Sequence, residues 1–289
     1  MAATVAQLID ILTLERIEDD IFRGRSPETT RQRVFGGQVL GQALMAVGRT
    51  APAERSVHSL HAYFLRPGDP AVPIVYVVER VRDGGSFSTR RVLAQQHGRP
   101  IFQMSASFQI AEDGFDHQEP IPPVVGPDGP GSSTEPPGVD AIRWADRLTE
   151  WAAIDVRFVP TVVDAGRRAG ADDNRLHVWL RAAEELPDDP LLHAAVLAYA
   201  SDMTLLSAAM VPHAQRLDDP RMQSASLDHA MWFHRPFRAD DWLLHDQWSP
   251  SASNARGLGQ GSIFTADGRL VVSAVQEGLT RWRPAIAPR

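Results

Sequence analysis

The order of predicted elements repeats along this chain of 289 residues. Each half has an apolar segment typical of a buried helix, at residues 36–51 and 190–210, followed by strand-like runs that include one tight turn. The strings FLRP at 64–67 and FHRP at 233–236 occupy corresponding places. This duplicated order constrains the fold more than any single motif does, because each copy must form the same unit.

A segment rich in Pro, Gly and Asp separates the two copies at residues 113–140. Its composition disfavours helices and strands, and we expect it to bury little surface. The sequence therefore predicts an N-terminal domain at 1–112, a linker at 113–140 and a C-terminal domain at 141–289.

The two helical segments are apolar on nearly all of their surface. Such a helix must be covered on most sides, which a strongly curved sheet can do. The runs that follow each helix are typical of antiparallel strands joined by short turns. We therefore predict an α+β fold with two domains, each a curved antiparallel sheet around one long helix.

Charge and composition exclude several classes of protein. The net charge of −7 disfavours nucleic-acid binding, and the absence of Cys excludes disulfides, thiolate metal sites and a Cys nucleophile. No Lys is present, which excludes Schiff-base chemistry. The acidic N-terminus does not resemble a signal peptide, and we expect no apolar run of the ~20 residues that a membrane span needs. The sequence predicts a cytoplasmic protein with no stable membrane insertion, no nucleic-acid partner and no metal or cofactor.

One carboxylate, Asp202, lies in a segment that is otherwise free of charge from Pro190 to Ala214. On a continuous helix it shares its face with four apolar or aromatic residues: Ala198, Tyr199, Leu205 and Leu206. A buried carboxylate is costly unless it is paired, hydrogen-bonded or functional. The pattern leaves open a structural Asp, which caps another group or bonds to Tyr199, and a general base whose pKa is raised by burial.

A second polar side chain, Gln276, lies on the apolar side of the last predicted strand, because alternation groups it with Leu270, Val272 and Ala274. Its amide must be satisfied there, either by a structural bond between strand and helix or by a functional partner. Ser226 begins an earlier strand-like run, and by pattern alone Asp228 is an equally good polar candidate.

Common catalytic motifs are absent or out of context. The sequence contains no G-x-S-x-G nucleophile elbow and no H-E-x-x-H metal motif. His58 and His61, three apart on a predicted strand, face opposite sides and do not form a metal site. The string GLGQGS at 257–262 precedes a strand rather than a helix, so it does not fit dinucleotide binding, but as a loop its backbone could approach a ligand closely.

Four long strings resemble the acyl-CoA thioesterase II family. They are RVFGGQVLGQAL at 33–44, HSLHAYFLRPGDP at 58–70, LAYASDMTLL at 197–206, and the stretch at 226–281 that begins SLDHAMWFHRPF and ends VQEGLTR. The resemblance covers nearly the whole chain and weakens in the linker. It implies two hot-dog domains in one chain, hydrolysis of acyl-CoA thioesters to fatty acid and CoA, and a homodimer or higher homo-oligomer.

The resemblance assigns catalysis to Asp202, Ser226 and Gln276, all in the second half. These residues would hold one water in line with the thioester carbonyl, with Asp202 accepting its proton and no covalent intermediate forming. The first half has no carboxylate in its helical segment, so we expect a degenerate copy that supplies packing and could line part of a substrate tunnel. Backbone N–H groups near a helix N-terminus are the expected oxyanion donors.

Two groups of residues are candidates for contact with CoA, because CoA carries phosphates. One is Arg256 with Gly257 and Gly259 in the Gly-rich string, and the other is the pair Arg90 and Arg91. Either group could instead belong to a solvated strand edge.

Two other functions are compatible with a hot-dog fold. Hot-dog enoyl-CoA hydratases pair an Asp with a His five residues later, but residue 207 is Ser here and His213 is too far from Asp202. A non-catalytic acyl-CoA-binding protein has no need for Asp202, Ser226 and Gln276 together. Release of free thiol from a panel of acyl-CoAs distinguishes these functions from a thioesterase.

Overall fold

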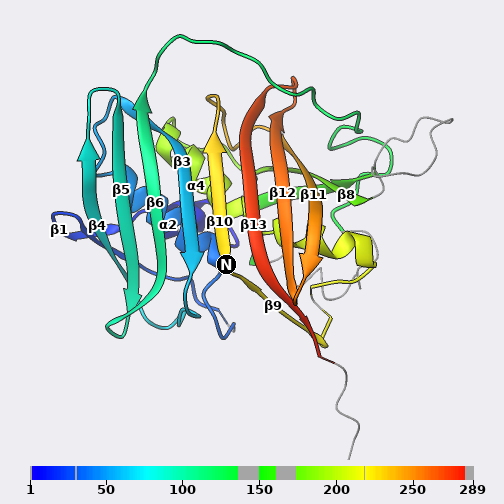
Figure 1. Cartoon of the computed structure of the whole chain (residues 1–289), viewed down its shortest axis with the longest axis horizontal. Coiled ribbons are helices and arrows are strands. Elements are labelled where there is room, and N and C mark those ends of the chain that lie inside the picture. The colour runs from blue at the N-terminus through cyan, green and yellow to red at the C-terminus, as the bar shows by residue number, and fades with distance from the viewer. Residues whose placement is uncertain (1, 30, 136–149, 161–173, 218, 284–289) are drawn as a thin grey trace, which may run out of the picture.

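The computed structural model describes residues 2–29, 31–135, 150–160, 174–217 and 219–283. In these residues thirteen strands form one antiparallel sheet, and Figure 1 shows it across the width of the molecule. The strand order is β1-β2-β4-β5-β6-β3-β10-β13-β12-β11-β8-β7, and β9 also pairs with β13. The two halves of the chain meet in the middle of this sheet, where β3 pairs with β10.

The first half contains two helices and six strands in the described residues. They are α1 (Val5–Leu12), β1 (Glu15–Glu18), β2 (Ile21–Gly24), α2 (Gly36–Gly48), β3 (Arg55–Phe64), β4 (Ile74–Asp83), β5 (Phe87–Gln96) and β6 (Arg99–Ile110). The predicted helix, strands and hairpin are confirmed, and the hairpin turn has positive φ at His97 and Gly98. The elements α1, β1 and β2 lie outside the predicted set.

The second half repeats this plan. Its elements are β7 (Ile154–Val159), β8 (Arg175–Ala182), α4 (Pro190–Ser201), η2 (Leu205–His213), β9 (Met222–Ser226), β10 (Asp228–Phe233), β11 (Leu243–Ser253), β12 (Arg256–Thr265) and β13 (Leu270–Trp282). The strands β7, β8 and β9 were not predicted, and Ser226, which was expected to begin a strand, is the last residue of β9. Asp189 caps the start of α4 by accepting a hydrogen bond from the Leu191 amide, and Pro190 occupies the first turn.

The prediction of one continuous helix over 190–210 is wrong. The α-helix ends at Ser201, Asp202 is its C-cap residue, and a 3₁₀ helix follows from Leu205. Polar side chains at the break bond to other groups: the Ser201 hydroxyl donates to the Ala198 carbonyl, and Thr204 accepts from Gln247 on β11. Both bonds lie where the α-helix changes to the 3₁₀ helix, on either side of the carboxylate.

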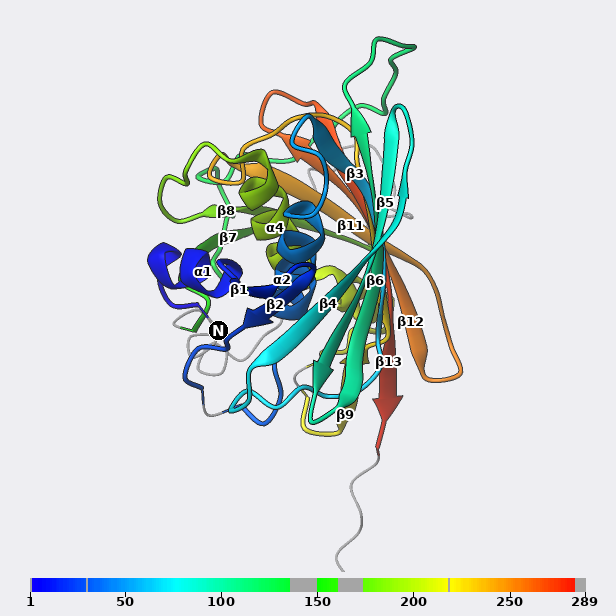
Figure 2. The same cartoon turned by 90° about the vertical axis from the view of Figure 1, so that its left-hand side faces the viewer.

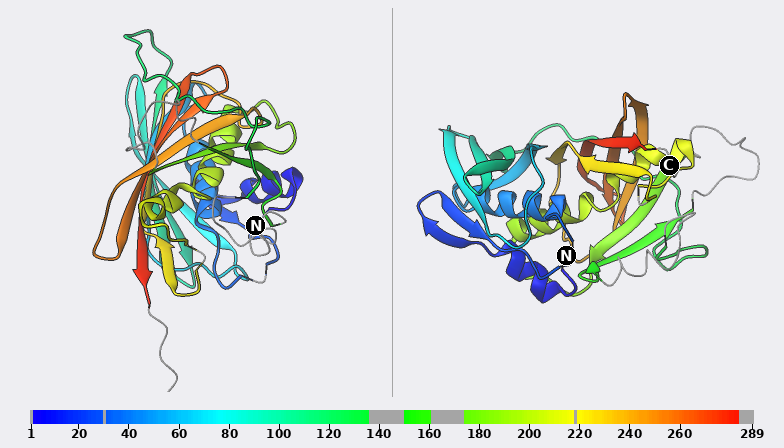
Figure 3. Two further views of the ribbon diagram at one scale, coloured as in Figure 1. Left: turned by 90° about the vertical axis from the view of Figure 1, so that its right-hand side faces the viewer. Right: turned by 90° about the horizontal axis from the view of Figure 1, so that it is seen from below.

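The helices α2 and α4 pack against each other on one face of the sheet, as Figure 2 shows. Their close approach depends on glycine, because a Cβ at Gly37 would lie 2.3 Å from the Tyr199 carbonyl oxygen. Figure 3 shows the sheet curving around the helices. The predicted α+β architecture of helices on curved antiparallel sheets is confirmed, while the domain boundaries at 112 and 140 stay predictions.

The stretch Pro190–His213, which joins α4 to η2, corrects one expectation. Its 24 residues are long and apolar enough to cross a membrane by length and composition, contrary to the expected absence of such a run. However, 78% of its most apolar window is buried inside the protein. The stretch therefore has the burial of a core helix.

The described part of the predicted linker buries more than expected. Ile121, Val124 and Val125 pack against a small cluster formed by Val159, Trp179, Leu244 and Phe264. The Trp179 indole also donates to the Val125 carbonyl at 2.9 Å. The segment forms no named helix or strand within residues 113–135, but these contacts attach it to the second half.

Candidate active site

Asp202 accepts hydrogen bonds from three parts of the chain. Its Oδ1 accepts from Gln276 Nε2 on β13 at 2.5 Å and from Ser226 Oγ at the end of β9 at 3.1 Å. The Gln276 amide also donates to Ser226 Oγ at 3.0 Å, which closes a ring of three side chains. The carboxylate accepts a further bond from the backbone amide of Gly37. The three residues named by the resemblance thus meet at one carboxylate oxygen.

The surroundings of Asp202 favour a base that works near neutral pH. Burial raises the pKa of Asp202 to about 6, and the bonds from Gln276, Ser226 and the Gly37 amide offset part of that rise. Above this pKa the carboxylate is ionised but poorly solvated, so it accepts a proton more readily than an exposed Asp.

Gln276 has one free acceptor in the site. Its side chain is fully buried, as alternation along β13 predicts. Its NH₂ group is used by Asp202 and Ser226, whereas its Oε1 has no hydrogen-bond partner among the described residues. A buried acceptor of this kind needs a donor, and a water molecule can supply one.

Ser226 faces the core because the chain bulges between β9 and β10. Ser226 pairs with Gly278 of β13, and Ala230 pairs with Val275 of the same strand. From Ser226 to Ala230 the chain advances four residues, while β13 advances only three over the same length. The extra residue makes a β-bulge, and side chains on the two sides of the bulge alternate in opposite phase. Asp228 is turned away from the site, and its Oδ1 accepts from the Glu277 amide at 2.6 Å. The structure therefore places Ser226 in the site and Asp228 outside it, a distinction that the sequence pattern did not make.

The first half contributes to the same site through the N-terminus of α2. The amide of Gly37 bonds to Asp202, and a Cβ at Gly36 would lie 2.7 Å from Asp202 Oδ2 and 3.0 Å from the Phe64 ring. The first turn of a helix has amides without intrahelical partners and favours negative charge. The first half therefore supplies backbone donors as well as packing.

A buried Ser–His pair lies next to Asp202, because Ser201 directly precedes it in the chain. This pair was not predicted from the sequence. Ser201 Oγ is 3.0 Å from His229 Nε2, and both side chains are fully buried. Burial, together with the neighbouring His245, lowers the pKa of His229 to about 3, so the ring is neutral. Residues 229 and 231 lie on the same face of a strand. The apolar Met231 could therefore have indicated that His229 faces the core.

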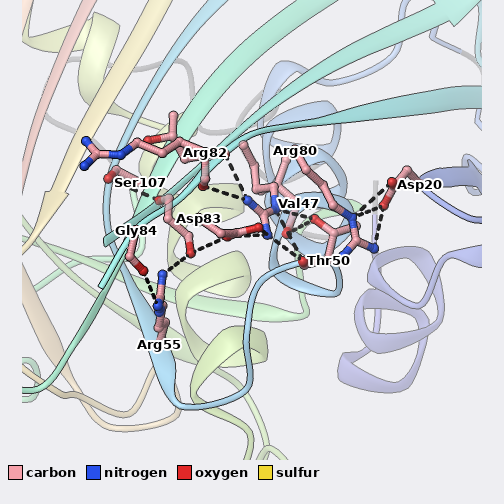
Figure 4. A network of polar contacts seen from close by, with 12 residues as sticks. Asp20, Val47, Thr50, Arg55, Arg80, Arg82, Asp83, Gly84 and Ser107 are labelled. Carbon is pink, nitrogen blue, oxygen red and sulfur yellow. Dashed lines mark hydrogen bonds and ion pairs between the residues drawn. The ribbon is translucent and has the colours of Figure 1, made fainter. Parts of the chain in front are cut away.

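Arg90 and Arg91 are not brought to the site. Arg90 is buried and donates to the Thr50 carbonyl at 3.0 Å and to Asp83 at 2.8 Å, in the network that Figure 4 shows around Thr50 and Asp83. Thr50 follows the C-terminal end of α2, whereas Asp202 lies beside the N-terminal end of the same helix. Thirteen helical residues separate the two ends by about 20 Å. Arg91 is exposed and pairs with Glu79. We do not propose either arginine as a contact for substrate.

The Gly-rich string forms part of strand β12 and is not a loop. A Cβ at Gly257 would lie 2.6 Å from the Ala209 Cβ, and one at Gly259 would lie 2.5 Å from the Leu205 carbonyl oxygen. These glycines therefore allow η2 to pack closely on the sheet. Arg256 is partly exposed and pairs with Glu277 at 2.9 Å, and its contact with CoA stays a prediction.

A cleft of about 820 Å³ lies beside α1 and the segment that follows β2. Its lining includes Arg25 and three carboxylates, those of Asp10, Glu28 and Glu150. This balance of charge does not suit the phosphates of CoA, so we do not assign the cleft to that part of the substrate.

Comparison with known proteins finds relatives that match both halves of the chain. The family model described as "Acyl-CoA thioesterase" matches residues 155–279, and the "Acyl-CoA thioesterase N-terminal domain" model matches residues 25–109. The chain is 38% identical to "Acyl-CoA thioesterase 2" of Haemophilus influenzae, over 98% of this chain and 99% of that protein. It is also 38% identical to "Acyl-coenzyme A thioesterase 8" of Homo sapiens, over 96% of this chain and 89% of that protein.

Solved structures show the same fold. An acyl-CoA thioesterase II, TesB2, from Mycobacterium marinum superposes with a TM-score of 0.79 at 47% identity and covers 96% of this chain and 99% of its own. A protein of unknown function with a hot-dog fold from Alicyclobacillus acidocaldarius superposes with a TM-score of 0.74 at 20% identity, covering 98% and 99% of the two chains. The predicted double hot-dog fold is confirmed by these likenesses.

Proposed function

This chain belongs to the acyl-CoA thioesterase family, and from that premise we propose that Asp202, Ser226 and Gln276 hold and activate the hydrolytic water. The activity is hydrolysis of acyl-CoA to a free fatty acid and CoA. The observation that carries the proposal is the convergence of Ser226 and Gln276 on one oxygen of a part-buried carboxylate with a raised pKa.

The acceptors in the site could bind one water molecule that donates both of its protons. One proton would point to the Asp202 carboxylate and the other to Gln276 Oε1, the acceptor without a partner among the described residues. The oxygen lone pair is then directed away from the protein, toward a thioester carbonyl carbon. Holding the nucleophile in this orientation lowers the entropic part of the barrier.

The reaction then proceeds by direct attack. The water oxygen bonds to the carbonyl carbon while Asp202 accepts a proton, and the amides of the first turn of α2 stabilise the developing oxyanion. The C–S bond breaks, CoA leaves as a thiolate, and the proton on Asp202 passes to the thiolate or to solvent. A thiolate is a good leaving group, so no strong general acid is required.

Assembly and location belong to this proposal as well. We expect a homodimer or higher homo-oligomer, as the family resemblance implies, and light scattering on the purified protein measures it. We also propose a cytoplasmic location, which fractionation of the producing cells measures. A relative from Saccharomyces cerevisiae, 28% identical over 84% of this chain, is named as a peroxisomal protein.

Thiol release from a panel of acyl-CoAs tests this function. Wild-type protein should release thiol, and Asp202→Asn should lose ~10²-fold or more in kcat, as expected for a positioned acid–base group. Asp69→Asn, a carboxylate in a first-half loop, is the matched control and should keep full activity. Binding of acyl-CoA without thiol release, hydration of an enoyl-CoA, or full activity of Asp202→Asn would contradict the proposal.

A further inference from the structure

We propose that Asp228 is a positioning residue of the active site, which holds the β-bulge that turns Ser226 toward Asp202 and Gln276. This inference rests on the proposed roles of those three residues. Asp228 lies two residues after Ser226 but does not point into the site, so it acts on the reaction only through its neighbours.

The bulge can be located from the register of the strands. Between the pairs Ser226–Gly278 and Ala230–Val275, one extra residue is present on the β9–β10 side. Residues 229 and 231 face the core, as the buried His229 and Met231 show. In a regular strand Ser226 would therefore face the opposite side. The bulge is what brings its hydroxyl to Asp202.

Asp228 replaces a backbone acceptor that the bulge removes. The Glu277 carbonyl of β13 accepts from the Leu227 amide at 3.0 Å, as in an ordinary ladder. The Glu277 amide points to the same side, but it donates to Asp228 Oδ1 at 2.6 Å instead of to a backbone carbonyl. The carboxylate thus satisfies the one donor that the extra residue leaves without a ladder partner.

The carbonyl of Leu227, the residue before Asp228, is already engaged and does not replace this acceptor. The Leu227 carbonyl accepts from the Phe64 amide of β3, on the other side of the chain, at 2.9 Å. If the Asp228 oxygen is removed, the Glu277 amide loses its acceptor unless the bulge itself closes. Closing the bulge restores alternation and turns Ser226 away from the carboxylate.

The bond also acts on Gln276, which directly precedes Glu277 in β13. Movement of this backbone would shift the Gln276 amide, which donates to both Asp202 and Ser226. The bonds from Gln276 and Ser226 each lower the pKa of Asp202. Their loss should therefore raise that pKa, which a general loss of stability would not do.

Two substitutions at Asp228 test the proposal. Asp228→Asn keeps an oxygen acceptor for the Glu277 amide and should retain most of the wild-type kcat. Asp228→Ala removes the acceptor, and we expect kcat to fall roughly 10- to 100-fold because the nucleophile is misplaced. KM should change less than about threefold, since contacts with bound substrate are not touched. The acid limb of the kcat/KM profile should move up by roughly half a pH unit or more.

Asp69→Ala is the matched control, because Asp69 Oδ1 also accepts from a backbone amide, that of Ala71, in a loop of the first half. The proposal is overturned if Asp228→Ala changes kcat no more than this control does, or if its acid limb stays at the wild-type pH. It is also overturned if Asp228→Asn loses kcat or fails to fold. Failure of the proposed function looks different, because Asp202→Asn would then hydrolyse acyl-CoA at the wild-type rate.

Discussion

At the scale of single residues, Asp202 is ionised where the fold disfavours a charge. Its pKa in the folded protein, about 6, lies above the ordinary value of 3.8. The folded state therefore binds this proton more tightly than the unfolded chain does. The stabilisation from the protonated acid is present at low pH and is lost as the pH rises through 6. The ionised form, which the proposed mechanism uses as the base, is thus the less stable form.

Substitution of Asp202 should separate stability from activity. At pH 7.5 Asp202→Asn should unfold at a higher denaturant concentration than wild type, with a gain of about 1–2 kcal/mol, because the buried charge is gone. The gain should disappear near pH 4, where Asp202 is largely protonated in the folded protein. Urea denaturation at the two pH values measures this, with Asp69→Asn as the control. A variant that is less stable than wild type at both pH values contradicts it.

The residue pattern could predict Asp202 and Gln276 but could not distinguish Ser226 from Asp228. An isolated charge in an apolar segment and an amide on an apolar strand face are both visible in the sequence. The orientation of Ser226 depends on a bulge in the pairing with β13, which no local pattern shows. The family resemblance named Ser226, and the register of the strands supplies a physical reason for its orientation.

At the scale of elements, the start of each helix was easier to predict than its end. The apolar segments and Pro190 mark where α2 and α4 begin, whereas α4 ends where Ser201 and Thr204 bond to the helix backbone and the sheet. The bond from Gln247 to Thr204 depends on a tertiary partner far away in the sequence. The same holds for the N-terminus of α2, whose contact with Asp202 appears only when the helices pack together.

A methyl group at the start of α2 should disturb the carboxylate. Gly36→Ala places a Cβ 2.7 Å from Asp202 Oδ2, closer than real contacts allow. We expect ~10²-fold lower kcat because a small displacement of the base suffices. Gly85→Ala is the matched control, since a Cβ there meets nothing within 4 Å. Thiol-release kinetics compare the two variants, and equal kcat values would show that the start of α2 does not constrain Asp202.

At the scale of the whole molecule, the proposed active site lies where the two halves of the chain meet. Duplication of the elements was visible in the sequence, but the expectation of a first half that supplies packing or tunnel wall did not include its contact with Asp202. Its α2 amide reaches Asp202, and β3 binds the Leu227 carbonyl beside Ser226. Each half lacks something that the other provides, so one chain with two copies forms one complete site of this kind in the described residues.

Acid should destabilise the whole molecule through two buried histidines. Burial lowers the pKa of both His229 and His245 to about 3, from an ordinary 6.5. The unfolded chain binds these protons first, so stability falls as the pH decreases below 6.5. Asp202 acts in the opposite direction, and together the three groups predict a net loss of roughly 2–3 kcal/mol between pH 7.5 and 5.

Urea denaturation at pH 7.5 and pH 5 measures this loss. His97→Asn is the control and should leave the difference unchanged, because the His97 side chain is largely exposed. Replacement of His245 by Asn should reduce the difference, since one buried titrating group is removed. A stability that does not fall between the two pH values contradicts the assignment of neutral, buried rings.

The most direct test of the central claim is the pH dependence of kcat/KM for acyl-CoA hydrolysis. Asp202 as the base predicts that kcat/KM rises with pH through one ionisation near 6, because only the carboxylate form accepts the proton of the water. In Asp202→Asn the remaining slow hydrolysis should show no ionisation near 6. A wild-type profile that is flat through this range, or an Asp202→Asn variant that keeps the same acid limb, would contradict the account.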